Sequence, residues 1–278
     1  MRFSLIVATI GRADQLRTFL TSVDAQAYRD FELVVVDQNS DDRVVPILAS
    51  YENKFPILHL RTPEKGASRA RNIGLQHVGG DVVAFPDDDC RYPADLLAMV
   101  SRIFEGRPEL DGVAVCSVDA EGRVSNGRLD GRSGPINGSN VWARAIEYTM
   151  FLREPSVRGL RFDEEIGPGA GTPLGAGEGT DYLLQLLERG GTLYYDADLA
   201  VVHASAVPPY DDRALARAYS YGTGFGYVLK KHKRPIRSKT SRLVRPLGGA
   251  ALSLMGLRTP EARYRWNTFR GRLRGLLL

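Results

Sequence analysis

Along the first 120 residues, continuous apolar runs alternate with segments whose apolar residues recur every three or four positions. Continuous runs are typical of buried strands, and the spaced pattern is typical of amphipathic helices. The predicted strands are Phe3–Thr9, Phe31–Asp37, Ile57–Leu60, Asp81–Phe85 and Gly112–Ser117. The predicted helices are Asp14–Gln26, one ending at Leu48, Gly66–Val78 and Pro93–Glu105. This alternation predicts an α/β fold with a mostly parallel, doubly wound sheet.

The pattern loosens after Asp119, where a glycine-rich polar segment precedes a predicted strand at Tyr148–Arg153. A second glycine-rich segment, Gly167–Gly179, leads into a predicted helix over Thr180–Gly190. Two further strands are predicted, at Thr192–Asp196 and Leu199–His203, and the chain after Asp211 is expected to be helical.

Charge is distributed unevenly along the chain. The net charge is +4, but the segment from Lys230 to Leu278 contains 14 Lys/Arg residues and one acid, Glu261, so that it carries +13 and the preceding residues carry −9. A basic segment of this kind suits an anionic membrane surface or nucleic acid. Because few aromatic residues and no known nucleic-acid motif accompany it, nucleic acid is not expected as a partner.

Composition excludes several classes of protein. The hydrophobic content of 43% provides an ample core, and two cysteines are too few for a disulfide framework. The N-terminal residues read as a strand and not as a signal peptide. No uncharged apolar stretch reaches the roughly 18 residues of a spanning helix. The default location is therefore the cytoplasm.

Three aspartates, Asp87, Asp88 and Asp89, directly follow the predicted strand Asp81–Phe85. Three adjacent like charges disfavour ionisation unless a positive charge lies nearby. They read either as a solvated acidic loop or as ligands for a hard divalent cation, which prefers oxygen donors. The ends of the strands at Thr9 and Asp37 should lie at the same edge of the sheet, where α/β proteins bind ligands.

Arg69 and Arg71 open the next predicted helix. Arginine binds phosphate in bidentate fashion, although two arginines can also simply cover a solvated helix face. The chain contains neither a GxxxxGK loop nor a GxGxxG fingerprint, which disfavours P-loop and dinucleotide-binding proteins.

Four blocks of sequence together resemble family 2 glycosyltransferases, which have the GT-A fold. They are the segment from Ser4 to Asp42, "GASRARNIGL", "VVAFPDDDC" and "GEGTDYLLQLLERG". The resemblance implies a GT-A domain over 1–208, with a nucleotide-sugar half (1–118) and an acceptor half (119–208). A basic helical extension over 209–278 would follow.

The resemblance also implies roles for individual residues. The nucleotide-sugar site would contain Thr9, Arg12, Asp37, Asn39, Arg69, Arg71, Asp87 and Asp88. Asp89 would bind Mn²⁺ or Mg²⁺, and His203 resembles a late histidine that completes the metal shell in some relatives. Two alternatives stay open: Asp88 as a solvated or outer residue, and His203 as a structural histidine.

The acidic motif of the resemblance contains the catalytic base, and the sequence departs from it. Relatives commonly have Gly-Glu-Asp, whereas this chain has Gly177, Glu178 and Gly179. Glu178 is the favoured base, and Asp181 is the alternative, although Asp181 also suits the first turn of a helix.

The resulting prediction is an inverting, metal-dependent glycosyltransferase. It would transfer sugar from a nucleoside-diphosphate sugar to a glycan or lipid-linked acceptor in surface polysaccharide synthesis. The alternatives are a sugar-phosphate nucleotidyltransferase, whose glycine-rich basic signature is missing after Thr9, and a non-catalytic nucleic-acid- or membrane-binding protein. Residues 230–257 combine basic and apolar segments. They are expected either to attach the protein peripherally to the inner face of the cell membrane or to form a packed helical hairpin.

Overall fold

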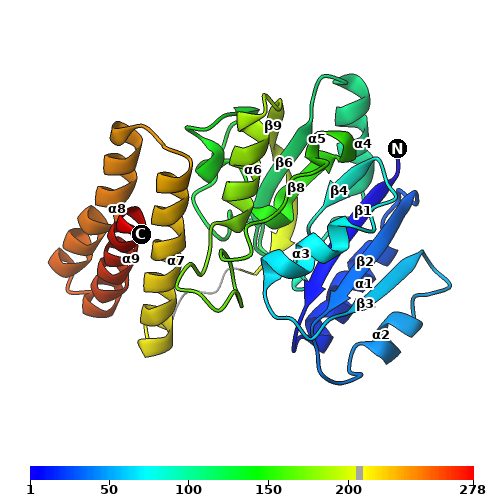
Figure 1. Ribbon diagram of the computed structural model, residues 1–278, viewed down its shortest axis with the longest axis horizontal. Coiled ribbons are helices and arrows are strands. Elements are labelled where there is room, and N and C mark those ends of the chain that lie inside the picture. Colours follow the sequence, from blue (N-terminus) through cyan, green and yellow to red (C-terminus); the bar gives the residue numbers. More distant parts are fainter. Residues whose placement is uncertain (205–208) are drawn as a thin grey trace. The chain divides into compact units, whose positions relative to one another are not determined.

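The structure, a computed structural model, describes residues 1–204 and 209–278, with the backbone alone for residues 236–239 (Figure 1). The chain forms two compact units. The sheet unit comprises Met1–Lys65, Arg69–Arg161 and the chain from Tyr182 to the gap at residues 205–208. The helical unit comprises Gly66–Ser68, Phe162–Asp181 and the chain after that gap. The predicted domain boundaries at 118 and 208 stay predictions, and residue 208 lies outside the described residues.

The sheet unit is built around one mixed sheet. Its strands are β1 (Phe3–Thr9), β2 (Phe31–Asp37), β3 (Ile57–Arg61), β4 (Val82–Ala84), β5 (Cys90–Arg91), β6 (Gly112–Val118), β7 (Gly134–Ile136), β8 (Met150–Arg153) and β9 (Leu193–His203). Their order is β3-β2-β1-β4-β8-β6-β9-β5, with β7 also on β9. The long pairings β1–β2, β2–β3 and β6–β9 are parallel, which agrees with the predicted fold. The short strands β5, β7 and β8 pair antiparallel.

The prediction of two strands at Thr192–Asp196 and Leu199–His203 is wrong, because both belong to β9. The register between β6 and β9 shifts between Val115 and Cys116, where β9 contains extra residues. This irregularity interrupts the apolar pattern without ending the strand.

Helices cover both faces of the sheet. They are α1 (Ala13–Asp24), α2 (Val45–Ala49), α3 (Ala67–Leu75), α4 (Leu96–Gly106), α5 (Glu154–Val157) and α6 (Glu178–Glu188), with 3₁₀ turns at Val141–Ala143 and Glu147–Thr149. Phe3, Leu5 and Val7 of β1 point into the main core, which also contains the apolar faces of α1 and α4. Ile6 points to the opposite face, against Gly74 of α3. This alternation follows from the two-residue period of a strand.

Cys90 and Cys116 are both free thiols, and both are buried in the sheet. Burial raises the pKa of the Cys90 thiol well above its ordinary value. Both the burial and the raised pKa of Cys90 disfavour a reactive thiolate at this position.

The helical unit contains α7 (Asp212–Lys231), α8 (Ile236–Met255) and α9 (Thr259–Leu277), which confirms that the chain after Asp211 is helical. Helices α7 and α8 both pack against α9. Glycines allow the closest approach: a Cβ built on Gly226 of α7 would lie 2.1 Å from the carbonyl oxygen of Arg272 of α9. Among residues 1–204 and 209–278, no helix has both the length and the apolarity that crossing a bilayer requires.

Candidate active site

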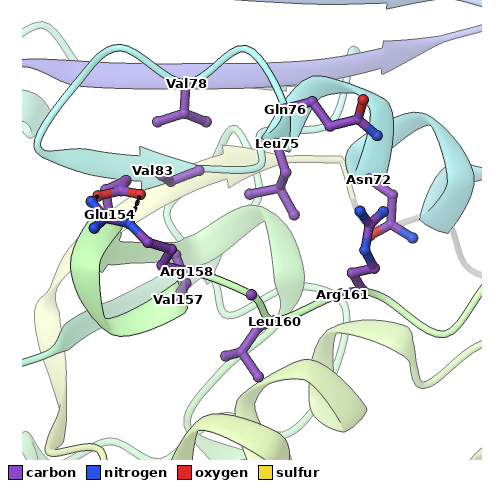
Figure 2. A pocket seen from close by; sticks show the side chains of 11 residues that line it. Asn72, Leu75, Gln76, Val78, Val83, Glu154, Val157, Arg158, Leu160 and Arg161 are labelled. Atoms are coloured by element: carbon purple, nitrogen blue, oxygen red, sulfur yellow. Dashed lines mark hydrogen bonds and ion pairs between the residues drawn. The ribbon is translucent and has the colours of Figure 1, made fainter.

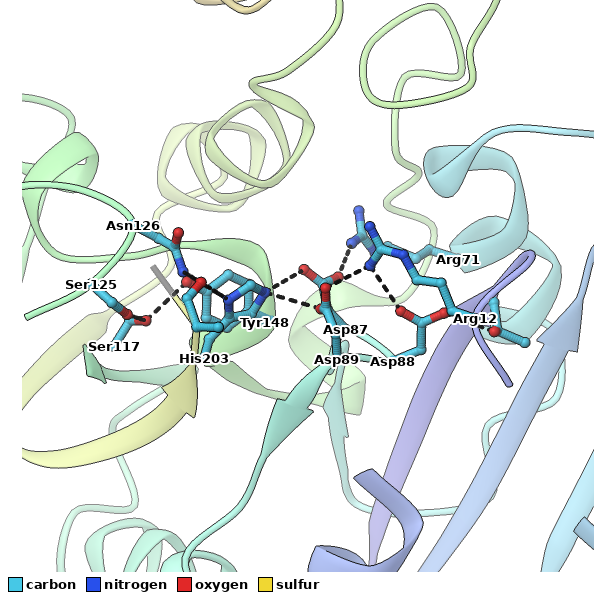
Figure 3. A network of polar contacts seen from close by, with 12 residues as sticks. Arg12, Arg71, Asp87, Asp88, Asp89, Ser117, Ser125, Asn126, Tyr148 and His203 are labelled. Carbon is cyan, nitrogen blue, oxygen red and sulfur yellow. Dashed lines mark hydrogen bonds and ion pairs between the residues drawn. The ribbon is translucent and has the colours of Figure 1, made fainter. Parts of the chain in front are cut away.

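The three aspartates that follow β4 form a carboxylate cluster, Asp87–Asp89, in the turn between β4 and β5 (Figure 3). Strand β5 pairs antiparallel with β9, and Cys90 lies opposite His203 in this pairing. The pairing therefore brings the imidazole of His203, from the far end of the sequence, beside Asp89.

Two carboxylates and one imidazole form a group that can bind a metal ion. One ligand atom from each of Asp87, Asp89 and His203 can be chosen so that all lie within 4.8 Å of one another. His203 Nε2 lies 3.0 Å from Asp89 Oδ1 and 3.9 Å from Asp87 Oδ2. Oxygen donors suit Mg²⁺ and Mn²⁺, and imidazole is also a ligand for transition metals.

The surroundings of this group fit a cation. Asp89 Oδ1 is buried, and the imidazole of His203 is the group that the described ion pairs place against it. The other ring nitrogen of His203, Nδ1, lies 3.0 Å from the carbonyl oxygen of Ala204, while Nε2 faces the two carboxylates. The ring of Tyr148 stacks on the imidazole at 4.6 Å, and Asn126 Nδ2 lies 2.8 Å from Nδ1. His203 is thus held in place by outer contacts, as metal-binding histidines commonly are.

Hydrogen bonds from neighbouring elements hold the remaining oxygens of the cluster. Thr9 Oγ1, at the end of β1, donates to Asp88 Oδ2 at 2.7 Å. Arg12 donates to Asp88 Oδ1 at 3.1 Å and to Asp89 Oδ2 at 2.7 Å, and Arg71 donates to Asp87 Oδ1 at 3.0 Å. The sequence had left Asp88 open as a solvated residue, but Asp88 is buried and paired.

Burial and charge act against each other in the cluster. Burial raises the pKa of Asp87 and of Asp88 to about 6 in each case. Burial also acts to raise the pKa of Asp89, but the contact with His203 and the charge of Arg12 outweigh it, so this pKa is lowered. For His203, burial acts to lower the pKa, but contact with Asp89 outweighs it and raises the pKa. The cluster therefore favours positive charge beside Asp89.

Asp37, at the end of β2, lies next to Thr9 in the β1–β2 register, as predicted from the strand ends. Its Oδ1 accepts hydrogen bonds from the backbone and side-chain nitrogens of Asn39 at 2.9 and 2.7 Å. Its Oδ2 lies 3.1 Å from Nε2 of His59 on β3. Asn39 Oδ1 in turn accepts from the backbone N–H of Gly11 at 2.7 Å. These contacts tie the ends of β1, β2 and β3 together.

The two arginines of α3 differ. Arg71 is buried and contacts the carboxylate cluster, so it does not merely cover a solvated face. Arg69 lies 3.3 Å from Glu64 Oε2 and donates to the carbonyl oxygen of Lys65. Its predicted nucleotide contact stays a prediction.

The acidic motif, Gly177–Asp181, begins helix α6 and lies in the helical unit. The side chain of Glu178 is buried, and its carboxylate lies beside Gly167: a Cβ built on Gly167 would be 3.0 Å from Glu178 Cδ and 3.2 Å from Ser68 Oγ. Gly167 also has φ of +113°, which favours glycine. The position of the Glu178 carboxylate therefore depends on a residue without a side chain.

Asp181 is fully buried and contacts Lys231 and His232 at the end of α7. Its Oδ1 lies 2.8 Å from His232 Nε2 and 2.9 Å from Lys231 Nζ. Lys231 also reaches Asp163 Oδ2 at 2.7 Å. Burial acts to raise the pKa of Asp181, but the hydrogen bonds from His232 and Lys231 outweigh burial and lower it.

A separate cavity of about 140 Å³ lies between the C-terminal part of α3, β4 and α5 (Figure 2). Its lining includes Leu75, Val83, Val157 and Leu160, with Arg158 and Arg161 among the polar groups. The carboxylate cluster is not part of this lining. We assign no function to this cavity.

Three residues that contact the acids of the candidate site were not predicted from the sequence. His59 lies within a short strand, Lys231 belongs to a basic run, and His232 stands between lysines. Each contacts an acid that lies in a different element of the fold. Only the position of His59 near a strand end offered a local signal.

A family model described as "Glycosyl transferase family 2" matches residues 4–156, more than half of the chain. An uncharacterized glycosyltransferase of Haemophilus influenzae is 31% identical over 201 residues, which cover 67% of this chain and 62% of that protein. The poly(ribitol-phosphate) beta-N-acetylglucosaminyltransferase TarS of Staphylococcus aureus is 34% identical over 93 residues, covering 32% and 16%. The matches thus span less than two thirds of the length of these curated relatives.

Solved structures show the same fold. The crystal structure of S. aureus TarS 1-349 aligns with a TM-score of 0.64 and 17% identity, covering 98% of this chain and 90% of that one. The mannosyltransferase PcManGT from Pyrobaculum calidifontis, in complex with GDP-Man and Mn²⁺, aligns with a TM-score of 0.67 and 18% identity, covering 99% and 87%. The predicted GT-A fold is confirmed, and the family match disfavours a sugar-phosphate nucleotidyltransferase.

Proposed function

The chain belongs to glycosyl transferase family 2, and from this premise we propose that it is an inverting, metal-dependent glycosyltransferase. The substrate would be a nucleoside-diphosphate sugar, and the acceptor would be a hydroxyl of a glycan or lipid-linked molecule. The observation that carries the proposal is the grouping of Asp87, Asp89 and His203 at an edge of the sheet where α/β folds bind ligands.

A divalent cation, Mn²⁺ or Mg²⁺, would be held by Asp87, Asp89 and His203, and as a Lewis acid it would offset the charge of the leaving diphosphate. Arg12 and Arg71 supply two further positive charges next to the cluster. Thr9 and Asp88, which are buried and hydrogen-bonded to each other, would form the wall toward the nucleotide. Asp37 and Asn39 would contact the base or ribose.

We assign the role of base to Glu178. In the transfer, the acceptor O–H loses its proton to a carboxylate while the acceptor oxygen bonds to the anomeric carbon. The bond from that carbon to the diphosphate oxygen breaks with its electron pair, and the nucleoside diphosphate leaves. A carboxylate acts as base only if its lone pairs are available to the substrate. Contacts with Lys231 and His232 lower the pKa of Asp181 and so weaken it as a base, which disfavours the alternative to Glu178.

The comparisons support a nucleotide-sugar donor without selecting one. Solved TarS structures contain UDP or UDP-GlcNAc, and the mannosyltransferase contains GDP-Man and Mn²⁺. The name of TarS specifies a poly(ribitol-phosphate) acceptor. A surface polysaccharide or another glycan fits the acceptor proposed for this chain.

A donor panel tests the proposal. Purified protein is incubated with UDP-, GDP- and dTDP-sugars and Mn²⁺ or Mg²⁺, and thermal shift and release of nucleoside diphosphate are measured. We expect at least one donor to stabilise the protein and to be hydrolysed slowly, with both effects abolished by EDTA. Release of pyrophosphate from a nucleoside triphosphate and a sugar phosphate would instead indicate a nucleotidyltransferase.

We also propose that the protein works from the cytoplasm on the inner face of the cell membrane, attached through residues 230–257. Within this segment, we expect the membrane contact to lie near the end of α8. Lys231 pairs with Asp163 and Asp181, and the side chains of Arg237 and Lys239 lie outside the described residues. The exposed apolar side chains of this segment are Val244, Leu247, Leu252, Leu254, Met255 and Leu257, of which Met255 is 82% and Leu257 is 90% exposed.

Flotation on vesicles tests this attachment. Removing the chain after Tyr227 would also remove Lys231 and His232 and leave Asp181 without its partners, so substitutions are the better test. The variant Leu254→Glu/Met255→Glu should bind phosphatidylglycerol vesicles at least about tenfold more weakly, since it removes apolar area and adds negative charge. Val124→Glu, at an exposed apolar position of the sheet unit, is the matched control. Equal binding by all three proteins, or binding by none at low salt, would contradict the proposal.

A further inference from the structure

One face of α7 follows the segment Pro173–Asp181, which leads into helix α6. Ser220, Gly224, Val228 and His232 are spaced four residues apart, so they lie along one face of the helix. Ser220 Oγ donates to the carbonyl oxygen of Pro173 at 3.2 Å, and the backbone N–H of Gly175 donates to the carbonyl oxygen of Ser220 at 3.2 Å. Helix α7 and this segment therefore lie side by side, joined by hydrogen bonds.

The contact in the middle of this face is between backbones. A Cβ built on Gly224 of α7 would lie 2.0 Å from the carbonyl oxygen of Ala176, a distance that real Cβ atoms do not show. A Cβ built on Gly177, whose φ is +111°, would lie 3.1 Å from Cγ2 of Val228. Helix α7 and the segment touch because glycines occur on both sides.

The contact at the end of this face is electrostatic. Lys231 and His232 hold Asp181, and Lys231 also holds Asp163. The tight glycine contact thus ends one or two residues before Glu178, and the ion pairs begin three residues after it. The first turn of α6, which carries Glu178, is fixed to α7 on both sides.

We propose that α7 is a template that positions Glu178 for catalysis, and that Gly224, Lys231 and His232 are positioning residues. This inference rests on the proposed transferase function and on Glu178 as its base. From the sequence, a boundary was predicted at residue 208 between a catalytic domain and a basic helical extension. The contacts within the helical unit instead make the first helix of that extension part of the scaffold of the base.

The variant Gly224→Ala tests the template. The added methyl must push Ala176 away, and a shift of about 1 Å at a catalytic group costs up to about a hundredfold in rate. We expect kcat for transfer to fall at least about tenfold, while the Kd of the nucleotide-sugar donor in Mn²⁺ changes by less than about twofold. A purely structural role would lower both together or neither.

Gly106→Ala, at the end of α4, is the matched control, because a Cβ built on Gly106 meets no atom within 4 Å. It should leave kcat unchanged and should not lower the melting temperature. Wild-type kcat in a folded Gly224→Ala variant would overturn the inference, as would equal losses in kcat and donor affinity. If the wild-type protein binds donors but transfers no sugar, the proposed function fails and not the template.

A second variant decides the matter if Gly224→Ala does not fold. Lys231→Gln keeps a polar side chain but removes the ammonium group that pairs with Asp181. We expect kcat to fall several-fold with donor affinity unchanged, and the pH at which transfer is half-maximal to stay the same, since the base itself is retained. An unchanged kcat would overturn the inference.

Discussion

The carboxylate cluster of the sheet unit and the acidic motif of the helical unit both contain buried acids, yet they are neutralised in different ways. In the carboxylate cluster, Asp89 contacts Arg12 and His203, yet 26% of its side chain is exposed. In the acidic motif, Asp181 is fully buried and contacts Lys231 and His232. A fully buried, paired acid stabilises the fold, whereas a paired acid that is still partly exposed can also bind a ligand. This difference separates the proposed metal site from the anchor next to the base.

Removing a ligand from the carboxylate cluster should have the largest effect. Asp89→Ala removes the only group that contacts both Arg12 and His203 among the described ion pairs, and it removes a proposed metal ligand. We expect Mn²⁺-dependent donor affinity to fall by more than about a hundredfold, because even outer residues of metal sites are worth about ten- to a hundredfold. Isothermal calorimetry with donor and Mn²⁺ measures it. Asp198→Ala, at an exposed acid, is the control, and wild-type turnover of Asp89→Ala in EDTA would refute the metal role.

Glu178→Gln should produce the next largest effect, on transfer alone. Glutamine keeps the shape of the buried side chain but cannot accept the acceptor's proton. We expect at least about a hundredfold loss in kcat, the usual range for general-base catalysis, with donor affinity nearly unchanged. Steady-state kinetics and donor titration check both. If Asp181→Asn shows this pattern and Glu178→Gln is mild, the wrong carboxylate has been chosen.

Asp181→Asn should act mainly on stability, with a several-fold loss in kcat through the contacts that position Glu178. It removes the anion that Lys231 and His232 contact, and breaking a buried ion pair costs about 3–5 kcal/mol. Because Lys231 is partly exposed and retains Asp163, we expect a loss of about 2–3 kcal/mol in the free energy of unfolding. Denaturant titration beside Asp198→Asn measures it, and an unchanged midpoint for Asp181→Asn would show that the pairing adds nothing.

The smallest effect should be on the pH dependence of stability. The folded-state pKa of Asp181 is lowered, so its contribution is fully present above the unfolded-state pKa, about 4, and is lost as the pH falls through the folded value. The stability gap between wild type and Asp181→Asn should therefore narrow as the pH falls below about 4. Denaturant titrations at several pH values measure this gap. A gap that widens on acidification would contradict the sign of the shift.

The same contrast explains what could be predicted from sequence. The parallel strands β1, β2 and β3 appear in the sequence as short apolar runs. From the ends of the predicted strands, Thr9, Asp37 and the carboxylate cluster were expected to lie at the same edge of the sheet. The carboxylate cluster itself can be read from the sequence, because its three aspartates are consecutive. Family resemblance supplied His203, whose contact with Asp89 depends on the pairing of β5 with β9.

The features that could not be predicted depend on contacts between segments that are distant in the sequence. Strand β9 was divided in two because its irregularity interrupts the apolar pattern. Lys231 and His232 lie about fifty residues from Asp181, and a basic run is equally compatible with solvent, lipid or a buried acid. Only the packing of α7 along the acidic motif distinguishes these cases. Sequence patterns report local period and charge, and they do not report which distant partner a side chain meets.

The two buried cysteines can report local opening of the sheet unit through their reaction with a thiol reagent. Cys90 and Cys116, the only thiols in the chain, both lie in the sheet unit, so a thiol reagent labels them only when that unit opens. Opening of the helical unit alone leaves the labelling rate unchanged. Labelling kinetics, read beside a signal for helix content, can therefore time the two units separately without adding a probe.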